Sequence, residues 1–202
     1  YHPIKRLVFR FSGTSASKGE LEALDSFIQH MVLTNERLKS QLDDQMPYFK
    51  ETVFQRLLRG ELTDAEIVEK TEQYGFPLKG KTFFVCVVDV DEYVRFRENY
   101  REKDRSLMLY ALRKMIEELC GEEPSITFAT AAPLPGQLAV IIGTERSGEA
   151  TERTVRNLAS RIQENVKRFF QITVTVALSR PAEGYRGVSE AYQQALELLS
   201  YR

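Results

Sequence analysis

Nine residues in the middle of the chain, residues 82–90, read Thr-Phe-Phe-Val-Cys-Val-Val-Asp-Val. β-branched and aromatic side chains dominate this short apolar run, which is typical of a buried strand. The fold therefore has to be built around a sheet, and the segments that follow indicate which one.

Those segments alternate in type. Residues 106–120 and 151–170 carry apolar side chains at helical spacing, whereas residues 126–131, 138–142 and 172–179 predict strands. The second and third strands are joined by a turn of hairpin length, and the other connections are long enough to be helices. The order β-α-β-β-α-β, closed by a further helix, predicts an α/β (α+β) domain of ferredoxin-like type. Its sheet would be a mixed, largely antiparallel one with helices on one face.

The helical spacing also predicts which side chains face the core. In residues 106–120 these include Leu107, Tyr110, Ala111, Ile116 and Leu119. In residues 151–170 they are Val155, Leu158, Ile162, Val166 and Phe169. In the closing helix, residues 188–201, they are Ala191, Ala195 and either Leu198 or Leu199.

A different pattern occupies residues 21–42. Apolar residues recur at spacings of 3 and 4, which makes a heptad repeat with one polar member in its seam. The seam consists of Leu21, Leu24, Ile28, Met31, Asn35, Leu38 and Leu42. With Leu21 at an a position, Asn35 is also at a, and a buried Asn there favours a parallel two-stranded coiled coil. The sequence thus predicts a homodimer through this helix. The e and g positions carry no ordered set of opposite charges, so packing of the stripe on the chain's own domain is the alternative.

Two shorter helices are expected between the heptads and the first strand. Pro47 interrupts the heptad pattern and is expected to begin a new helix at its first turn, which Gly60 ends. Its apolar face would consist of Phe49, Val53, Phe54, Leu57 and Leu58. Residues 63–66, Thr-Asp-Ala-Glu, have the spacing of a capping box, and Gly75 is the expected C-cap of the helix that follows.

Charge and cysteine usage exclude several classes of function. Lys plus Arg number 28 and Asp plus Glu 29, a balance that argues against a dedicated nucleic-acid-binding domain. His2, His30, Cys86 and Cys120 form neither a Cys-x-x-Cys motif nor a Cys/His cluster, which argues against a zinc site and a Cys-His nucleophile. We expect both cysteines to be reduced, buried thiols in a cytoplasmic protein.

The two ends suggest a piece of a longer protein. The chain begins at Tyr1 without a methionine and ends inside a predicted helix. Its longest apolar run is far short of a membrane span. Residues 13–19, Gly-Thr-Ser-Ala-Ser-Lys-Gly, have the composition of a mobile linker.

Two stretches resemble the GGDEF domain of diguanylate cyclases. Residues 87–93, Val-Val-Asp-Val-Asp-Glu-Tyr, are similar to the family's first strand and the Asp-x-Asp-x-aromatic motif that follows it. Residues 134–142 fall where the family has Gly-Gly-Asp-Glu-Phe and an apolar strand. In this chain the five motif positions are Leu134, Pro135, Gly136, Gln137 and Leu138. Residues 172–179 and 189–196 are similar to the family's last core strand and closing helix, so the resemblance covers about residues 81–202.

Departures from the family's pattern bear on catalysis. The resemblance implies that cyclisation of GTP uses two divalent cations held by carboxylates of the first strand and of the hairpin motif. Asp89 keeps the first carboxylate, whereas Gly136 and Gln137 carry no charge. Leu134 and Pro135 replace the glycines that let the backbone approach the nucleotide.

The positions of the family's base-reading Asn and Asp hold Arg97 and Glu98. We therefore expect no enzyme activity, no cofactor and no metal, with Asp89 at most a remnant of a metal site. An alternative interpretation of Asp89 and Asp91 is a strand-end turn whose carboxylates cap a helix.

The order of shorter motifs resembles a narrower group, the degenerate GGDEF-like middle domains of membrane-anchored bacterial transcription regulators of the AraC family. Residues 1–8 are similar to the segment after a transmembrane helix, and residues 46–49 and 57–60 to the start of the middle domain. The resemblance implies a sensor or transmembrane segment upstream, and contact with DNA only through a helix-turn-helix region that this chain lacks.

These observations predict four segments. Residues 1–19 would be a HAMP-like remnant and linker, residues 20–46 a signalling coiled coil, residues 47–80 a helical lead-in, and residues 81–202 the degenerate GGDEF-like domain. The leading hypothesis is a non-catalytic module that dimerises and relays a signal.

Two other hypotheses compete with the signal relay. The first is a sensor that binds a nucleotide or another anion without turnover, with Arg95, Arg97 and Arg101 near the groove or, alternatively, on a solvated helix face. The second, more remote, is an active cyclase.

Overall fold

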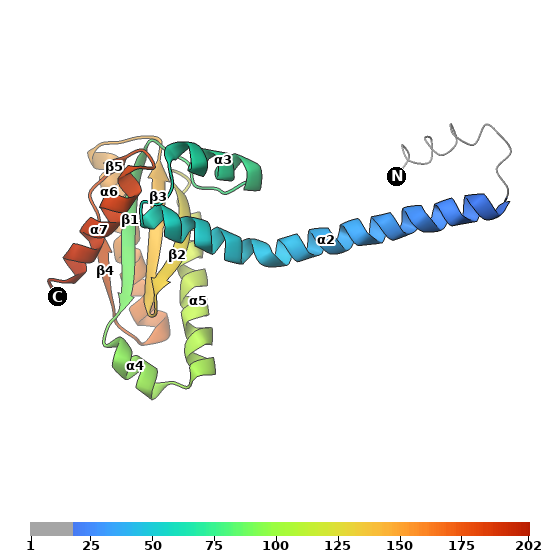
Figure 1. The fold of residues 1–202 in the computed structure, drawn as a ribbon. Coiled ribbons are helices and arrows are strands. Elements are labelled where there is room, and N and C mark those ends of the chain that lie inside the picture. Colours follow the sequence, from blue (N-terminus) through green and yellow to red (C-terminus); the bar gives the residue numbers. More distant parts are fainter. Residues whose placement is uncertain (1–17) are drawn as a thin grey trace. The chain divides into compact units, whose positions relative to one another are not determined.

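The computed structural model describes residues 18–202, which form two units, residues 18–47 and residues 48–202 (Figure 1). The expected post-membrane segment and most of the linker, residues 1–17, lie outside the described residues. Within residues 18–202, no helix has the length and apolar content that a membrane span requires.

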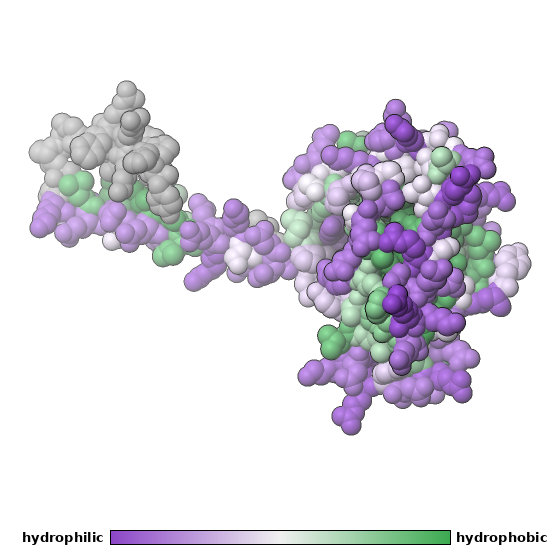
Figure 2. All heavy atoms as spheres, turned by 180° about the vertical axis from the view of Figure 1, so that it is seen from behind, coloured by the Kyte–Doolittle hydropathy of each residue, from purple (hydrophilic) through white to green (hydrophobic). Residues whose placement is uncertain are grey.

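One long helix, α2 (Lys18–Leu58), begins in the first unit. Lys18 and Gly19, which we expected in the linker, are helical. In residues 18–47 the heptad side chains Leu21, Leu24, Met31 and Leu38 are exposed, and apolar spheres interrupt the hydrophilic surface of this stretch (Figure 2). The expected helix is confirmed, while its pairing with a second copy stays a prediction.

The expected helix start at Pro47 is wrong, because Pro47 lies inside α2. A proline removes one i to i−4 hydrogen bond from a helix, but the turns on either side can remain helical. The end of α2 is as expected: Val53, Phe54, Leu57 and Leu58 are buried, and Gly60 has a φ of 72° just after the last turn.

The second unit is built on a sheet in the order β2-β3-β1-β4. Its strands are β1 (Thr82–Val90), β2 (Thr127–Leu134), β3 (Gln137–Thr144) and β4 (Val174–Leu178). All neighbouring strands are antiparallel. This is the ferredoxin-like order, so the predicted fold class is confirmed. A short fifth strand, β5 (Ala182–Glu183), pairs with the start of β1 and was not expected.

Helices cover both faces of this sheet, so the expectation of helices on one face is wrong. Even-numbered residues of β1, such as Phe84 and Cys86, pack in one core with helices α5 (Glu102–Gly121) and α6 (Glu149–Phe170). The odd-numbered Phe83 and Val85 are equally buried on the opposite face. There α7 (Gly187–Leu199) packs along β1 and β4 (Figure 1). The six consecutive apolar residues 83–88 need a cover on each side of the sheet, which is why the middle of β1 does not alternate with polar residues.

The remaining helices refine the expectations. The capping box of α3 (Asp64–Tyr74) is present, and Gly75 is its left-handed C-cap. A short helix, α4 (Tyr93–Asn99), was not expected.

Several side chains that were predicted to face the core are exposed. Leu107 and Tyr110 on α5 are 65% and 60% exposed, and Phe169 on α6 is 63% exposed. On α5 the neighbouring Met108 and Leu109 pack against the core instead, and at the end of α6 Phe170 does so in place of Phe169. On α7, Leu199 is buried and Leu198 exposed.

Both cysteines are free and buried in the α5–α6 core, as expected. Burial raises the pKa of each thiol, Cys86 and Cys120, to about 12. A thiol with such a pKa stays protonated and is a poor nucleophile at neutral pH.

Candidate functional site

The degenerate motif forms a tight turn between β2 and β3. Leu134 pairs with Gln137, so only Pro135 and Gly136 form the turn. Gly136 has a φ of 74°, and Pro followed by a left-handed Gly is typical of a type II turn. The strands are therefore longer than expected, and the turn is shorter than the predicted residues 133–137.

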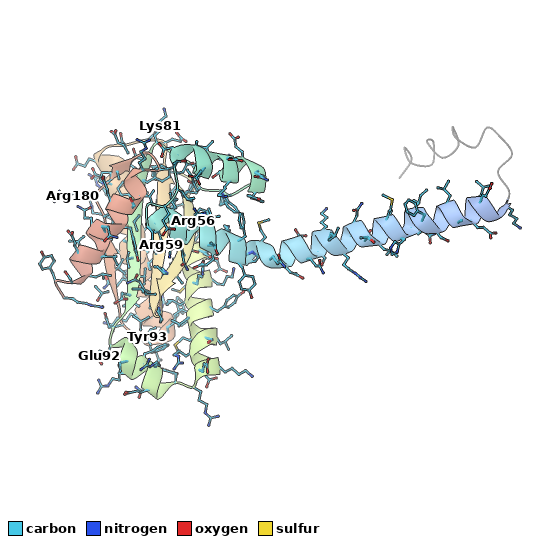
Figure 3. The ribbon with its side chains drawn as sticks, in the orientation of Figure 1. Arg56, Arg59, Lys81, Glu92, Tyr93 and Arg180 are labelled. Atoms are coloured by element: carbon cyan, nitrogen blue, oxygen red, sulfur yellow. The ribbon has the colours of Figure 1, made fainter. Side chains whose placement is uncertain are left out.

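The ring of Tyr93 lies against Gly136. A Cβ atom at this position would be 2.3 Å from Cδ2 of Tyr93, far inside van der Waals contact. Figure 3 labels Tyr93 and its neighbour Glu92 at the start of α4, close to where β1 ends. No side chain, acidic or otherwise, can stand at Gly136 unless Tyr93 moves.

Gln137, at the second acidic position of the motif, faces another protein group. Gln137 pairs with Asp89 across the β1–β3 ladder and is 8% exposed. The hydroxyl of Tyr192, on α7, donates to Oε1 of Gln137 at 3.2 Å. Burial raises the pKa of Tyr192, against the opposing effect of Arg59, so the hydroxyl stays protonated and able to donate.

Asp89 and Asp91, at the end of β1, both accept from the guanidinium of Arg202. Nη1 of Arg202 lies 3.0 Å from Oδ1 of Asp91, and Nη2 contacts Oδ2 of Asp89. The hydroxyl of Thr175, on β4, also donates to Asp91 at 2.6 Å. The alternative interpretation of these carboxylates as helix caps is wrong, because the N-cap of α4 is Glu92 and no side chain caps it.

These residues do not fit a pair of divalent cations. The remaining carboxylates are bound to a guanidinium, and Gln137 offers an amide already engaged by Tyr192. Among residues 18–202, no group of three His, Cys, Asp or Glu side chains is placed to hold a metal ion.

A cavity of about 460 Å³ lies between α5 and the β2–β3 turn. Its lining includes apolar residues of α5 and all five positions of the degenerate motif. Arg113 is the only lining residue with a formal charge. Arg95, Arg97 and Arg101 are exposed and do not line this cavity, and Arg95 pairs with Glu92 at 3.0 Å.

A β-bulge precedes the motif on β2, the edge strand. Ala131 pairs with Ala139 and Leu134 with Gln137, so β2 has one residue more than β3 between these pairs. The backbone N–H and carbonyl of Ala132 instead form hydrogen bonds with side chains of α2. Its N–H donates to Oε1 of Glu51 at 2.7 Å, and its carbonyl accepts from Nε2 of Gln55 at 3.3 Å.

Arg113 of α5 completes this contact. Its Nη2 lies 2.7 Å from Oε2 of Glu51 and 3.0 Å from the carbonyl of Thr130. Glu117 accepts from the Thr130 hydroxyl at 2.8 Å and lies 3.4 Å from Nε of Arg113. We call these six residues the α2–β2 joint: Glu51, Gln55, Arg113, Glu117, Thr130 and Ala132.

The joint holds its two carboxylates in the charged state. Burial opposes ionisation of Glu51, but hydrogen bonds from Ala132, Gln55 and Arg113 outweigh it, so the pKa lies below the ordinary 4.5. The pKa of Glu117 is lowered in the same way, with burial outweighed by Thr130, Lys114 and Arg113. Both carboxylates are therefore ionised at neutral pH.

The sequence did not reveal the joint or Arg202. A Glu and a Gln four residues apart on a helix are too common to indicate a contact with a distant strand. The Pro133 that follows the bulge was the one available signal, because proline within a strand indicates an edge or a bulge. Arg202 had no signal, since its partners are more than a hundred residues away.

A family model and a curated relative match this chain. The GGDEF-like domain family matches residues 59–201. An uncharacterized HTH-type transcriptional regulator of Bacillus subtilis, YtdP, is 23% identical over 209 residues. The match covers all of this chain and 27% of the relative, so the chain spans about a quarter of that protein.

Two solved domains of diguanylate cyclases are similar to part of this chain. The active GGEEF domain of a diguanylate cyclase from Vibrio cholerae is 11% identical with a TM-score of 0.49, over 66% of this chain and 81% of that one. The GGDEF domain of DgcB from Caulobacter crescentus, solved with c-di-GMP, is 16% identical with a TM-score of 0.46, over 75% and 82%. Because the family match spans residues 59–201, more than half of the chain, the chain belongs to the GGDEF-like domain family.

Proposed function

We propose that this chain is a non-catalytic signal-transmission and dimerisation module of a bacterial transcription regulator, of the AraC type. An upstream sensor, in a membrane-anchored protein, would alter the paired helices of residues 20–46 on the cytoplasmic side. The domain would pass that change to a helix-turn-helix region elsewhere in the protein. The relative from Bacillus subtilis, named as an HTH-type transcriptional regulator, supports the regulatory context.

The α2–β2 joint is the observation that carries this proposal. Side chains from the last turns of α2 satisfy both backbone groups of Ala132, two residues before the degenerate motif. A helix that only linked two domains would not need side chains that bond to the backbone of a bulged strand in place of a neighbouring strand. A rotation or shift of α2 has to break these bonds or move β2 with it, so the joint couples helix geometry to the motif turn.

Charge and space at the motif support the proposed loss of catalysis. Cyclisation of a nucleoside triphosphate such as GTP needs cations held by carboxylates close to the phosphates. The ring of Tyr93 fills the space that a side chain at Gly136 would need. Gln137 accepts a hydrogen bond from Tyr192, and Asp89 pairs with Arg202.

Incubation of the chain with GTP and Mg²⁺ or Mn²⁺, followed by chromatography of the nucleotides, tests this part. We expect no c-di-GMP above a protein-free control. Product that disappears in the Asp89→Ala variant would overturn the proposal, whereas product that persists in that variant would indicate a contaminating cyclase.

A second candidate, a small-molecule sensor, is favoured by the cavity beside the motif turn. Its volume lies within the range of ligand sites in proteins, about 300–1,000 Å³. The lining is largely apolar, and Nε and Nη2 of Arg113 are engaged by Glu51, Glu117 and Thr130. The chemistry of this lining suits an uncharged apolar molecule better than a nucleotide.

Thermal unfolding in the presence of GTP, GMP and the uncharged probe N-phenyl-1-naphthylamine separates these ligand classes. A sensor of this chemistry would be stabilised by the apolar probe and not by the nucleotides, and the shift would disappear in Leu134→Arg at the cavity rim. Leu198→Arg, on an equally exposed leucine of α7, is the matched control.

A further inference from the structure

The two carboxylates at the end of β1 hold the chain that leaves α7. Arg202 lies three residues beyond Leu199, the last residue of that helix. Its guanidinium contacts both carboxylates through separate nitrogens, Nη1 to Asp91 and Nη2 to Asp89. The side chains of Asp89 and Asp91 are 16% and 29% exposed, so both lie partly inside the protein.

Other contacts hold both aspartates in place. Asp91 is fixed from the other side by the Thr175 hydroxyl, and its backbone N–H donates to the carbonyl of Thr173 at 3.0 Å. Asp89 is held within the β1 ladder, opposite Gln137 and Thr175. Two carboxylates two residues apart repel each other, and a guanidinium offers separate donors to each and keeps its charge at any physiological pH.

We propose that Asp89 and Asp91 form an ion-pair clamp on the chain that follows α7, with the guanidinium of Arg202 as their permanent counter-ion. In the cyclases that the chain resembles, carboxylates in these places would hold divalent cations, and the residues present here do not fit that role. In the clamp, two carboxylates that resemble part of a cyclase's catalytic site have a structural role instead. They anchor the C-terminal side of the domain, whereas α2 lies on its N-terminal side. The clamp does not depend on the proposed signal relay.

The clamp has a consequence for the last turn of α7. The N–H groups of Ser200 and Tyr201 bond back to the carbonyls of Glu197 and Leu198. Arg202 fixes the residue that follows these bonds, so its release should let the turn fray. It should also leave two adjacent carboxylates without a counter-ion, which is an arrangement that attracts cations.

Hydrogen–deuterium exchange of the intact chain tests the clamp. In Arg202→Gln we expect exchange at Ser200 and Tyr201 to rise about fivefold, the upper end of the effect of losing an exposed ion pair, because one guanidinium contacts two carboxylates. The Asp89→Asn/Asp91→Asn variant should give the same rise, and combining it with Arg202→Gln should add nothing further. Arg186→Gln is the matched control, because Arg186 pairs with Asp64 at 3.6 Å elsewhere on the surface.

Two results would overturn the proposal in this experiment. One is an exchange rate at Ser200 and Tyr201 in Arg202→Gln equal to that in Arg186→Gln. The other is full additivity of the arginine and aspartate changes, which would mean that they act independently.

Terbium luminescence, sensitised by nearby tyrosines such as Tyr93, gives a second readout. We expect Tb³⁺ to bind Arg202→Gln at least about tenfold more tightly than the unaltered chain, because the carboxylates lose their internal cation. Adding Asp91→Asn to that variant should remove the gain. Equal Tb³⁺ binding by the unaltered chain and Arg202→Gln would overturn the proposal, since it would mean that the guanidinium does not occupy the site.

Discussion

At the scale of single residues, Gly136 decides what the motif turn can contain. Its φ of 74° favours glycine, and Tyr93 fills the space that a side chain would need. An acidic side chain therefore cannot be placed at Gly136 by one substitution unless Tyr93 moves.

Gly136→Ala measures this closure. We expect it to lower the free energy of unfolding by about 2–4 kcal/mol, from backbone strain plus overpacking against Tyr93. Gly75→Ala is the matched control, because Gly75 has a φ of 66° and open space around its Cβ position, so it reports the strain alone. Urea unfolding gives the loss of unfolding free energy in each variant. Equal losses in both would mean that Tyr93 does not block a side chain at Gly136.

Single residues were also the scale at which sequence predicted least. The substitutions at Gly136 and Gln137 could be read directly, because charge is a property of the residue itself. Their partners Tyr93 and Tyr192, and the Arg202 contact, depend on where the chain brings distant segments together. The exposed Phe169 shows the same limit, since helical spacing marks an apolar stripe but not where the sheet beneath it ends.

At the scale of elements, the α2–β2 joint ties a helix to an edge strand. A bulge frees the backbone of Ala132, and Glu51 and Gln55 satisfy it. This arrangement also blunts the edge of the sheet, which would otherwise offer unpaired groups to another chain.

Glu51→Gln tests the charge within the joint. We expect a loss of about 1–3 kcal/mol of unfolding free energy at pH 7, because Arg113 and the Ala132 N–H lose an ionised acceptor. Glu72→Gln, on an exposed glutamate of α3, should change the unfolding free energy little.

The pH dependence has a definite sign. The folded-state pKa of Glu51 lies below the ordinary 4.5, so its contribution is complete above that value and is lost as the pH falls through the lower, folded-state pKa. Urea unfolding between pH 7 and pH 3 should show a shallower decline in Glu51→Gln than in the unaltered chain. A parallel decline would mean that the joint does not hold the charge.

Elements were the scale at which sequence predicted best. β1 was placed with its observed bounds, and the capping box and Gly75 marked both ends of α3, because these signals are local. α4 and β5 escaped notice because a helix of seven residues and a strand of two carry too little pattern. The helix through Pro47 is the clearest failure, since the proline was expected to divide a segment that is helical on both sides of it.

At the scale of the whole molecule, the proposal needs two copies of the chain. Leu21, Leu24, Met31 and Leu38 of the heptad seam are exposed within residues 18–47, as a dimerising surface must be before it pairs. In sedimentation at micromolar concentration we expect a dimer, and Leu38→Glu, in the seam, should give a monomer. Leu33→Glu is the matched control, because Leu33 is exposed but lies off the seam, and it should leave the dimer intact. A monomeric unaltered chain, or equal effects of both variants, would argue against the seam.

We propose that the geometry of the paired helices reaches the motif turn through the α2–β2 joint. Amide exchange at Ala132 tests it in chains with residues inserted between Asp44 and Gln45. A two-residue insertion rotates the following helix by about 200°, whereas a seven-residue insertion returns it nearly to phase. We predict that exchange at Ala132 changes severalfold with two inserted residues and stays near the original rate with seven. Equal rates in all three chains, each still a dimer, would contradict the account.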